Sequence, residues 1–219
     1  MGEATLDQTS NRLIIQSSIY IYGDAADQSL ALRMAEDIAR IWNEPEAMIT
    51  IHHQLYAVQF EIEGIYAPDL KPEDIWYNDN PRLNFFRVEE YSNIDISFVD
   101  DLGSNTGYFK IANLRQTATT SAHEYGHTLG LEHPHLLDIR GKGIPGIMYP
   151  RGTLCDPQYQ YDPAVRAGEK GGTLDPQWRK VLPTDIEDLR LHKLLFNEKG
   201  KAVVGEFTSI YHEKHLPQQ

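Results

Sequence analysis

Three histidines and a glutamate in one short stretch have the types and the spacing of a metal-binding site. The stretch begins at His123 and ends at His133, and its sequence is H-E-x-x-H-x-x-G-x-x-H. His123 and His127 are four residues apart, so on a helix they lie on one face, one turn apart. Two imidazoles in that arrangement can bind one zinc ion through nitrogens at roughly 2.0–2.1 Å.

Two further features of the stretch complete a reactive arrangement. Glu124 directly follows the first histidine, where its carboxylate can reach a water bound to the metal. Gly130 predicts the end of the helix, because glycine adopts the left-handed conformation at little cost and lets the chain turn. His133 would then supply a third nitrogen from outside the helix. Three protein ligands leave a fourth position open for water, which is typical of a catalytic zinc site rather than a structural one.

The pattern is more specific than a pair of histidines on a helix. At average residue frequencies, its five fixed positions occur by chance in a chain of this length on the order of once in 10⁵. The alternative is a buried helix whose histidines only satisfy hydrogen bonds, but that interpretation explains neither the glutamate nor the third histidine. His135 lies two residues past the third histidine, and the spacing favours His133 over it as the ligand.

The stretch resembles the zinc signature of the metzincin clan of metallopeptidases. That clan also has a methionine turn beneath the metal, and the sequence at 146–150, G-I-M-Y-P, resembles one. The resemblance implies that Met148 forms an apolar floor under the zinc ligands. It also implies that Tyr149 and Pro150 line the wall of the pocket for the residue after the scissile bond. The methionine turn is similar to that of matrixins, whereas Pro134, directly after the third histidine, is similar to serralysins.

The resemblance also implies a fold and an activity. The fold class would be α+β, with a twisted, mostly parallel sheet, an antiparallel edge strand, an active-site helix, and a C-terminal subdomain that holds the methionine turn and a helix. A single catalytic domain would span residues 1–219, with an upper subdomain at about 12–130 and a lower subdomain and tail at 131–219. The activity would be that of a zinc-dependent endopeptidase with Zn²⁺ as cofactor. Its activated water would lose a proton to Glu124 as general base.

The role of such a chain stays open at this point. A peptidase of this kind could be an exported toxin or effector, or an intracellular processing enzyme. The alternative from another class is a catalytically silent module that keeps the metzincin-like site only to bind zinc or protein. The intact Glu124 argues against that alternative, because a module without turnover needs no general base.

Composition and charge exclude some classes of partner. A chain of 219 residues fits one domain, or one domain with a small appendage. The formal net charge is −12 and no cluster of Lys and Arg stands out, which disfavours a nucleic-acid partner. No apolar run approaches the ~20 residues that a membrane span requires. We therefore expect a protein or peptide substrate, no membrane span, and a monomer.

The single cysteine and the first residues bear on the compartment. Cys155 has no partner for an internal disulfide, which suits a reducing compartment. We interpret it as a buried or incidental thiol rather than as a thiolate that blocks the zinc. Residues 1–11 lack a basic start followed by an apolar run, so no secretory signal is predicted. The expected location is therefore the cytoplasm, or outside the cell by a signal-less route.

A scaffold of strands and helices must position these residues. Apolar side chains at helical spacing predict a helix from about Asp27 to Asn43. Strands are predicted at 13–22, 48–63, 83–88, 94–99 and 106–112, a further helix at Thr184, a last weak strand at 201–211, and loose tails at 1–10 and after 211. His52 and His53 are interpreted as structural or surface residues, because adjacent strand residues face opposite sides.

The segment around the zinc helix has the most specific structural expectations. Thr106–Ala112 would be the edge strand that pairs with an extended substrate, as in metzincins. Asn113 would cap a helix that runs from Leu114 to about Leu129. The pair Asp100-Asp101 indicates a turn, with calcium binding as its less common use. The long segment 150–183 contains several Gly and Pro and little periodicity, and such segments are often functional.

Overall fold

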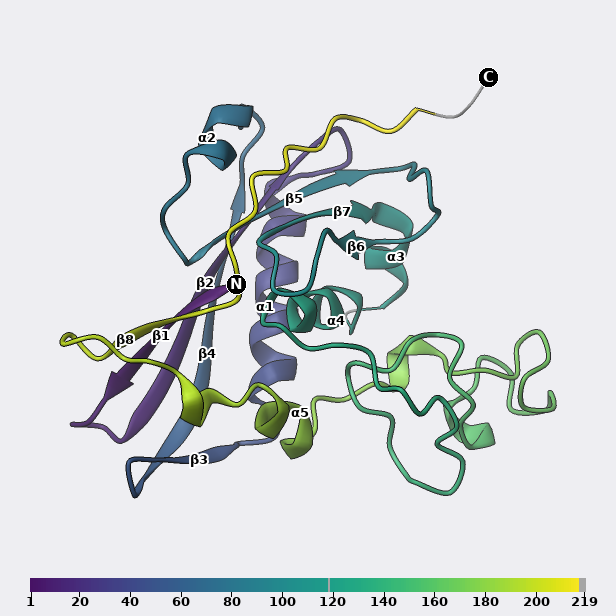
Figure 1. The fold of residues 1–219 in the computed structure, drawn as a ribbon. Helices are drawn as coiled ribbons and strands as arrows, with labels where there is room; N and C mark the ends of the chain where they lie inside the picture. The colour runs from purple at the N-terminus through teal and green to yellow at the C-terminus, as the bar shows by residue number, and fades with distance from the viewer. Residues whose placement is uncertain (118, 217–219) are drawn as a thin grey trace.

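Strands and helices combine in a mixed α and β fold (Figure 1). The computed structural model describes residues 1–117 and 119–216. Within them, eight strands form one sheet in the order β3-β4-β2-β5-β7-β6, with β1 and β8 attached beside β2. The strands are β1 (Gly2–Asp7), β2 (Arg12–Tyr22), β3 (Met48–Ile51), β4 (Gln54–Tyr66), β5 (Leu83–Glu89), β6 (Phe98–Val99), β7 (Thr106–Lys110) and β8 (Lys201–Val204). The central strands β4, β2, β5 and β7 run parallel, and the edge strand β6 is antiparallel to β7.

Helices are few and mostly short. The α-helices are α1 (Gln28–Asn43), α2 (Pro72–Trp76), α3 (Ile111–Gln116), α4 (Thr119–Thr128) and α5 (Pro183–Asp188), and the 3₁₀ turns are η1 (Pro157–Tyr159), η2 (Pro176–Trp178) and η3 (Leu191–Lys193). The expected α+β class, with a largely parallel sheet and an antiparallel edge strand, is therefore confirmed. No helix of the described residues combines the length and the apolar character that crossing a bilayer demands.

Helix α1 provides much of the core beside the sheet, as its apolar spacing predicts. Asp27 caps its start, accepting a hydrogen bond from the Leu30 backbone N–H at 2.7 Å. The residues of the predicted apolar stripe are all buried, namely Leu30, Met34, Ile38, Ile41 and Trp42. Burying each such side chain contributes about 1.5–3 kcal/mol. Trp42 reaches past the sheet, and its indole N–H donates to the Ala122 carbonyl of α4 at 3.0 Å. The position of α4 thus depends on α1.

Two predictions near the N-terminus are wrong. Residues 1–10 are not a loose tail, because β1 pairs antiparallel with both β2 and β8. The single strand expected at 48–63 is a hairpin of β3 and β4 that turns at His52 and His53. Both histidines have left-handed backbones, with φ of 48° and 66°, and both are exposed, so their interpretation as surface residues is confirmed. The β1–β8 pairing joins opposite ends of the chain, whereas the β3–β4 hairpin is local and depends on the turn at His52 and His53.

The edge of the sheet also differs from the prediction. Only Phe98 and Val99 of the expected strand at 94–99 pair with β7, and Ile94 and Ile96 are exposed. Thr106–Ala112 is not the edge, because β7 lies between β5 and β6. The antiparallel edge strand is therefore β6. The short alternating pattern at 94–99 did not distinguish a strand from a loop.

The zinc helix begins later than predicted. Two helices, α3 and α4, replace the single helix from Leu114 to Leu129, and Thr117 lies between them in an extended conformation. The Thr117 hydroxyl accepts a hydrogen bond from the Thr119 backbone N–H at 3.2 Å, at the start of α4. Asn113 is inside α3 rather than at a cap. Hydroxyl-rich residues compete with the helix for hydrogen bonds, which accounts for the break.

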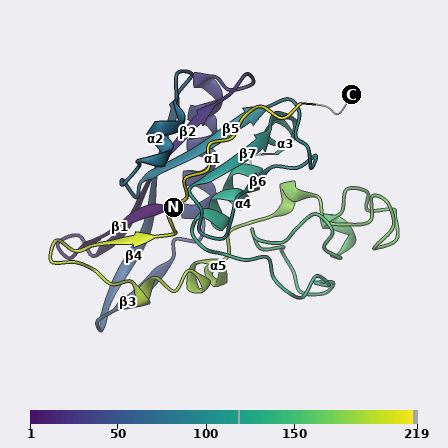
Figure 2. The ribbon, with the colours of Figure 1, turned by 45° about the horizontal axis from the view of Figure 1, so that its top comes forward.

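Residues 131–182 form a lobe of turns on the other side of α4 from the sheet (Figure 2). Ile139, Cys155 and Leu174 make a small core of this lobe, against which Tyr149 and Tyr159 pack. Burial raises the pKa of the Cys155 thiol to about 11. The interpretation of Cys155 as a buried thiol is therefore confirmed.

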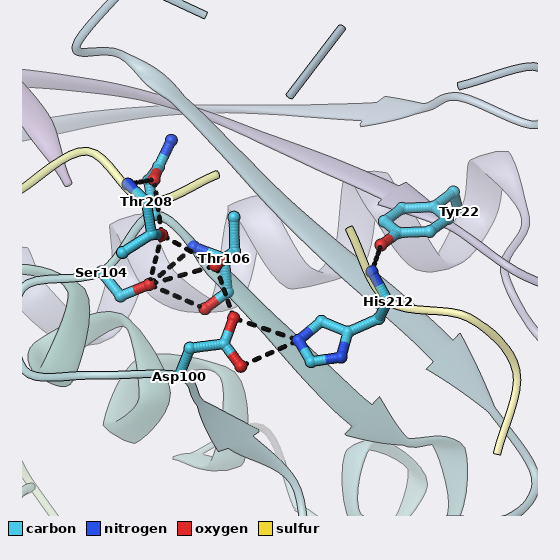
Figure 3. A network of polar contacts seen from close by, with 7 residues as sticks. Tyr22, Asp100, Ser104, Thr106, Thr208 and His212 are labelled. Carbon is cyan, nitrogen blue, oxygen red and sulfur yellow. Dashed lines mark hydrogen bonds and ion pairs between the residues drawn. The ribbon is translucent and has the colours of Figure 1, made fainter. Parts of the chain in front are cut away.

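The last described residues fold back over the sheet instead of forming a tail. After β8, the chain runs beside β5 and β7 (Figure 1). Thr208 bonds with Asn105, and the His212 backbone N–H donates to the Tyr22 hydroxyl at 3.1 Å. The His212 ring pairs with Asp100 at 2.8 Å (Figure 3). The same ring lies edge-on to Tyr108. Residues 205–216 therefore brace the turn next to β6.

Candidate metal centre

Three imidazole rings from α4 and the turn after it converge on one point. The Nε2 atom of His133 lies 3.0 Å from that of His123 and 3.1 Å from that of His127. Ligand nitrogens of the three residues all lie within 4.8 Å of one another. Among the described residues, this is the one group of His, Cys, Asp or Glu side chains close enough to share an ion. The sequence prediction of three convergent histidines is thus confirmed in its geometry.

The outer nitrogens of two rings are held by backbone carbonyls. His123 Nδ1 lies 2.7 Å from the Ile147 carbonyl, and His127 Nδ1 lies 2.7 Å from the Leu131 carbonyl. A carbonyl only accepts, so each Nδ1 carries the proton and donates it. In a neutral ring, Nε2 then has a free lone pair that faces the cluster. Such carbonyl partners are the usual second support of a metal-binding histidine.

The surroundings of the three rings favour their neutral forms, although only His123 is buried and His133 is exposed. Desolvation lowers the pKa of His123 well below its ordinary value, with Arg179 and His127 adding to the effect. Desolvation also lowers the pKa of His127, and it lowers that of His133 to about 4. At neutral pH all three rings therefore present lone pairs rather than charges, which is the state that binds a metal ion.

The geometry fits a tetrahedral metal ion. With metal–nitrogen bonds of 2.0–2.1 Å, the nitrogens of a tetrahedral site are roughly 3.3–3.4 Å apart. The two nitrogen–nitrogen distances of 3.0 and 3.1 Å need only a small opening of the cluster to reach that value. Imidazole suits several transition metals, so the donor set by itself does not choose among them. The residues present can therefore hold one metal ion, and its identity belongs to the proposal below.

Helix α4 is held by contacts at two successive residues. The Tyr125 hydroxyl bonds with Ser17 of β2 at 2.8 Å, and its ring lies edge-on to Trp42 of α1. At the next residue, a Cβ at Gly126 would overlap the sulfur of Met148 and approach Trp42 Cζ2 to 3.2 Å. Gly126 lies between the two helical histidines in the sequence, so Met148 packs directly against the helix turn that carries them. Met148 thus packs against the helix that carries two of the histidines, and its role as an apolar floor under a metal stays a prediction.

Gly130 ends the helix and redirects the chain, as predicted. Its φ is 94°, in the left-handed region that glycine favours, and its N–H donates to the His127 carbonyl at 3.0 Å. The Leu131 N–H donates to the Gly126 carbonyl at 3.0 Å, which closes the turn. His133 is thereby brought back to face the two helical histidines.

Glu124 lies in the same cleft as the three histidines. Its side chain is 7% exposed, and desolvation raises its pKa to about 8 against the opposing effect of Arg179 and Arg151. The cleft has a volume of about 640 Å³. Beyond the histidines and Glu124, its lining includes residues of β6 and of the turn after it, Asn113 and Thr120 of the helices, and Pro150, Arg151, Gly152 and Arg179 of the lobe.

The other predicted site residues are placed as follows. Pro150 lines the cleft, whereas Tyr149 packs in the small core of the lobe. Their roles in substrate binding stay predictions. Asp100 accepts from the Thr106 hydroxyl and pairs with His212, so it serves the turn and not an ion site. The expected function of segment 150–183 is consistent with its position, because it supplies one wall of the cleft.

Sequence reasoning did not identify Arg151 and Arg179 as cleft residues. Both lie within the segment that was expected to be functional, but nothing in their local sequence separates them from surface arginines. Their position depends on contacts of the lobe with α4. Thr119, at the start of α4, donates to the Pro176 carbonyl at 2.7 Å.

Sequence comparison with protein families and curated proteins adds no functional evidence to this geometry. No protein family matches the chain, and no curated protein is similar to it in sequence. The metzincin clan therefore stays a resemblance carried by short motifs. What this chain has, independently of any relative, is a cluster of three neutral imidazoles that can hold a metal ion beside a buried carboxylate.

Proposed function

We propose that the chain is a zinc-dependent endopeptidase in which Glu124 is the general base. The observation that supports this most is the convergence of three neutral Nε2 atoms in a cleft that also contains a buried carboxylate from the same helix. A site that only stored or sensed a metal would not require that carboxylate. The metzincin-like signature and methionine turn support zinc as the metal.

The residues of the cleft would divide the chemistry between them. A zinc ion held by His123, His127 and His133 would supply Lewis acidity to the attacking water and to the scissile carbonyl. Glu124 takes the proton of the attacking water and then gives it to the leaving amine. Burial raises its pKa, which makes the ionised carboxylate a stronger base, and the positive charges of Arg179 and of a bound zinc ion would favour that ionised form before the attack. No side-chain nucleophile is required.

The sheet edge beside the cleft supports a peptide as substrate. Strand β6 is the last strand of the sheet at this side, and Phe98 and Val99 line the cleft. An extended peptide can add to such an edge by main-chain hydrogen bonds, which bind it without much sequence preference. This mode would place an internal peptide bond near the histidines, which favours an endopeptidase.

The test separates the carboxylate's role from the metal's. Glu124→Gln is expected to abolish hydrolysis of a peptide library while one zinc per chain remains by metal analysis. The matched control is Glu132→Gln, an exposed carboxylate of the same cleft, which should leave hydrolysis nearly unchanged. Chelation of the wild-type protein should also stop hydrolysis, and zinc should restore it. Retained hydrolysis in Glu124→Gln would refute the assigned base, and a zinc-loaded wild type without turnover would favour the silent binding module.

A further inference from the structure

Arg179 is a cation of the cleft whose guanidinium has no acceptor. The side chain is 7% exposed, and its Nε is buried without a hydrogen-bond partner. Across residues 1–117 and 119–216, no hydrogen bond or close ion pair engages the guanidinium. Arginine stays charged in proteins, so burying it without a partner costs stability. Such a group marks a place where an anion can bind.

The backbone around Arg179 is held in position from two sides. Its N–H donates to the Pro176 carbonyl at 3.1 Å, and that carbonyl also accepts from Thr119 at the start of α4. The next residue, Lys180, donates its N–H to the Pro145 carbonyl at 3.0 Å, just before the methionine turn. Arg179 is therefore fixed relative to both the zinc helix and the methionine turn before any ligand binds.

The acidic groups near Arg179 are otherwise used. Desolvation lowers the Arg179 pKa to about 10, and Glu124 is the largest influence that opposes this. Glu124 is reserved for proton transfer in the proposed reaction. Asp175 accepts hydrogen bonds from the backbone and side chain of Gln177, at 3.2 and 2.6 Å. Neither Glu124 nor Asp175 forms a hydrogen bond or a close ion pair with the Arg179 guanidinium.

A second arginine extends the positive side of the cleft. Arg151 is exposed, lines the cleft, and donates to the Asn113 side chain at 3.3 Å. Two other acidic residues of the cleft, Asp101 and Glu132, are exposed, so water screens their charges. In a chain with a net charge of −12, this is a localised attraction for an anionic group.

We propose that Arg179 determines substrate specificity by binding a carboxylate group of the peptide, an inference that rests on the peptidase function proposed above. The planar fork of a guanidinium matches a carboxylate with two parallel hydrogen bonds. The carboxylate belongs to an Asp or Glu side chain near the scissile bond, or to the C-terminus of the peptide. Arg151 at the rim assists its approach.

The first experiment compares matched peptides on the wild-type enzyme. One pair differs only by Glu or Gln at each position near the scissile bond, with blocked ends, and the other pair differs by a free or an amidated C-terminus. The kcat/KM is expected to be roughly 30-fold or more higher for the carboxylate member of one pair, as for other buried charge pairs. The pair that discriminates identifies the source of the carboxylate. Equal rates within both pairs would overturn the proposal.

Variants then assign the preference to Arg179. In Arg179→Gln, the ratio of rates within the discriminating pair should fall to about one, while hydrolysis of the neutral peptide is largely kept. Arg179→Lys, which keeps the charge without the fork, should retain a reduced ratio. Arg166→Gln is the matched control, an exposed arginine of the same lobe that does not line the cleft, and it should change the ratio little. An equal loss on both peptides in Arg179→Gln would show a role on Glu124 instead and refute the proposal. If that variant does not fold, the wild-type comparison and Arg179→Lys decide the question.

A binding measurement separates this inference from the peptidase function. Titration calorimetry with the zinc-loaded Glu124→Gln protein measures affinity for the same peptides without turnover. Tighter binding of the carboxylate peptide, lost on adding Arg179→Gln, would support the inference even if the wild type cleaves nothing. Hydrolysis without any preference for the carboxylate would instead refute the inference and leave the peptidase function intact.

Discussion

The proton on Nδ1 of each helical histidine decides what the cluster can bind. Because His123 and His127 donate from Nδ1 to the carbonyls of Ile147 and Leu131, their lone pairs can only be on Nε2. Two such lone pairs directed at His133 repel one another unless a proton or a cation lies between them. A divalent metal ion satisfies all three rings at once, which makes it the occupant that the geometry favours.

The lowered histidine pKa values predict resistance to acid release of the metal. Protons compete with a metal for Nε2 only near or below the pKa of each ring, and desolvation lowers all three values, that of His133 to about 4. Bound zinc, measured by metal analysis after equilibration across a pH series, should therefore still be one per chain at pH 6.5, the ordinary histidine value, and should be released only at a lower pH. Half-release at or above that pH would contradict the account, and so would full retention in strong acid.

A half-buried carboxylate next to the methionine turn predicts a second pH effect. Burial raises the pKa of Asp185 from 3.8 to about 6, although backbone N–H groups of Leu182 and Ile147 bond to it. Between these values the folded chain binds a proton that the unfolded chain has lost, so stability falls as pH rises through this range. In Asp185→Asn the decrease in the free energy of unfolding over this pH range should be about 1–3 kcal/mol smaller, because asparagine does not titrate. Urea unfolding at pH 4.5 and pH 7 tests this; the same pH dependence in both proteins would contradict it.

Among the elements, α4 depends most on close packing. A methyl group at Gly126 would overlap Met148 and press on Trp42, so Gly126→Ala should destabilise the fold by about 1–3 kcal/mol. It should also weaken zinc binding, because Met148 packs against the turn between the two helical histidines. Gly152→Ala is the control, since a Cβ there meets nothing within 4 Å. Denaturant unfolding and zinc titration of both variants give the comparison. Equal stability and affinity in the two would contradict the packing argument.

Local patterns predicted some elements and not others, for a physical reason. Helix α1 and the end of α4 at Gly130 follow from spacing and from glycine's conformational freedom, which are properties of neighbouring residues. Strand β1 also pairs with β8 near the other end of the chain, and β6 is the edge because β7 pairs with both β5 and β6. His52 and His53 adopt left-handed backbone conformations at the hairpin turn. Glycine predicts such a conformation far more strongly than histidine does. Sequence alone could not supply these contacts.

The candidate site likewise combines residues that the local sequence predicts with residues that it does not. The three histidines and Glu124 were predictable, because metal chemistry fixes their types and a helix fixes their spacing. Arg179 was not, since it reaches the cleft through contacts between the lobe and α4. Residues that bind substrate come from such irregular segments, whose path local sequence does not determine.

At the scale of the whole molecule, the chain's last described segment braces the cleft. Residues 205–216 cross from β8 to the turn between β6 and β7, where His212 pairs with Asp100 (Figure 3). The two side chains are 13% and 7% exposed, so water screens this pair little. His215 stacks on Tyr108, with ring centroids 3.9 Å apart. The edge strand that would receive a peptide thus depends on the far end of the chain.

Loss of this brace should reduce stability without removing the metal. Asp100→Ala leaves the Thr106 hydroxyl and the His212 ring without their acceptor, which should cost about 1–3 kcal/mol. The neighbouring exposed residue gives the control, because Asp101→Ala should change stability by no more than about 0.5 kcal/mol. Urea unfolding measures both. The zinc content should be equal in the two variants, and a loss of zinc in Asp100→Ala alone would contradict separate roles for the brace and the metal cluster.

The most direct test of the central claim is an anomalous-scattering map of crystals grown from zinc-loaded protein. The account predicts one strong peak at roughly 2.0–2.1 Å from the Nε2 atoms of His123, His127 and His133. It also predicts that the Glu124 carboxylate faces the open side of that ion. A map of fully loaded protein with no peak among the three rings, or with the zinc bound elsewhere, would contradict it.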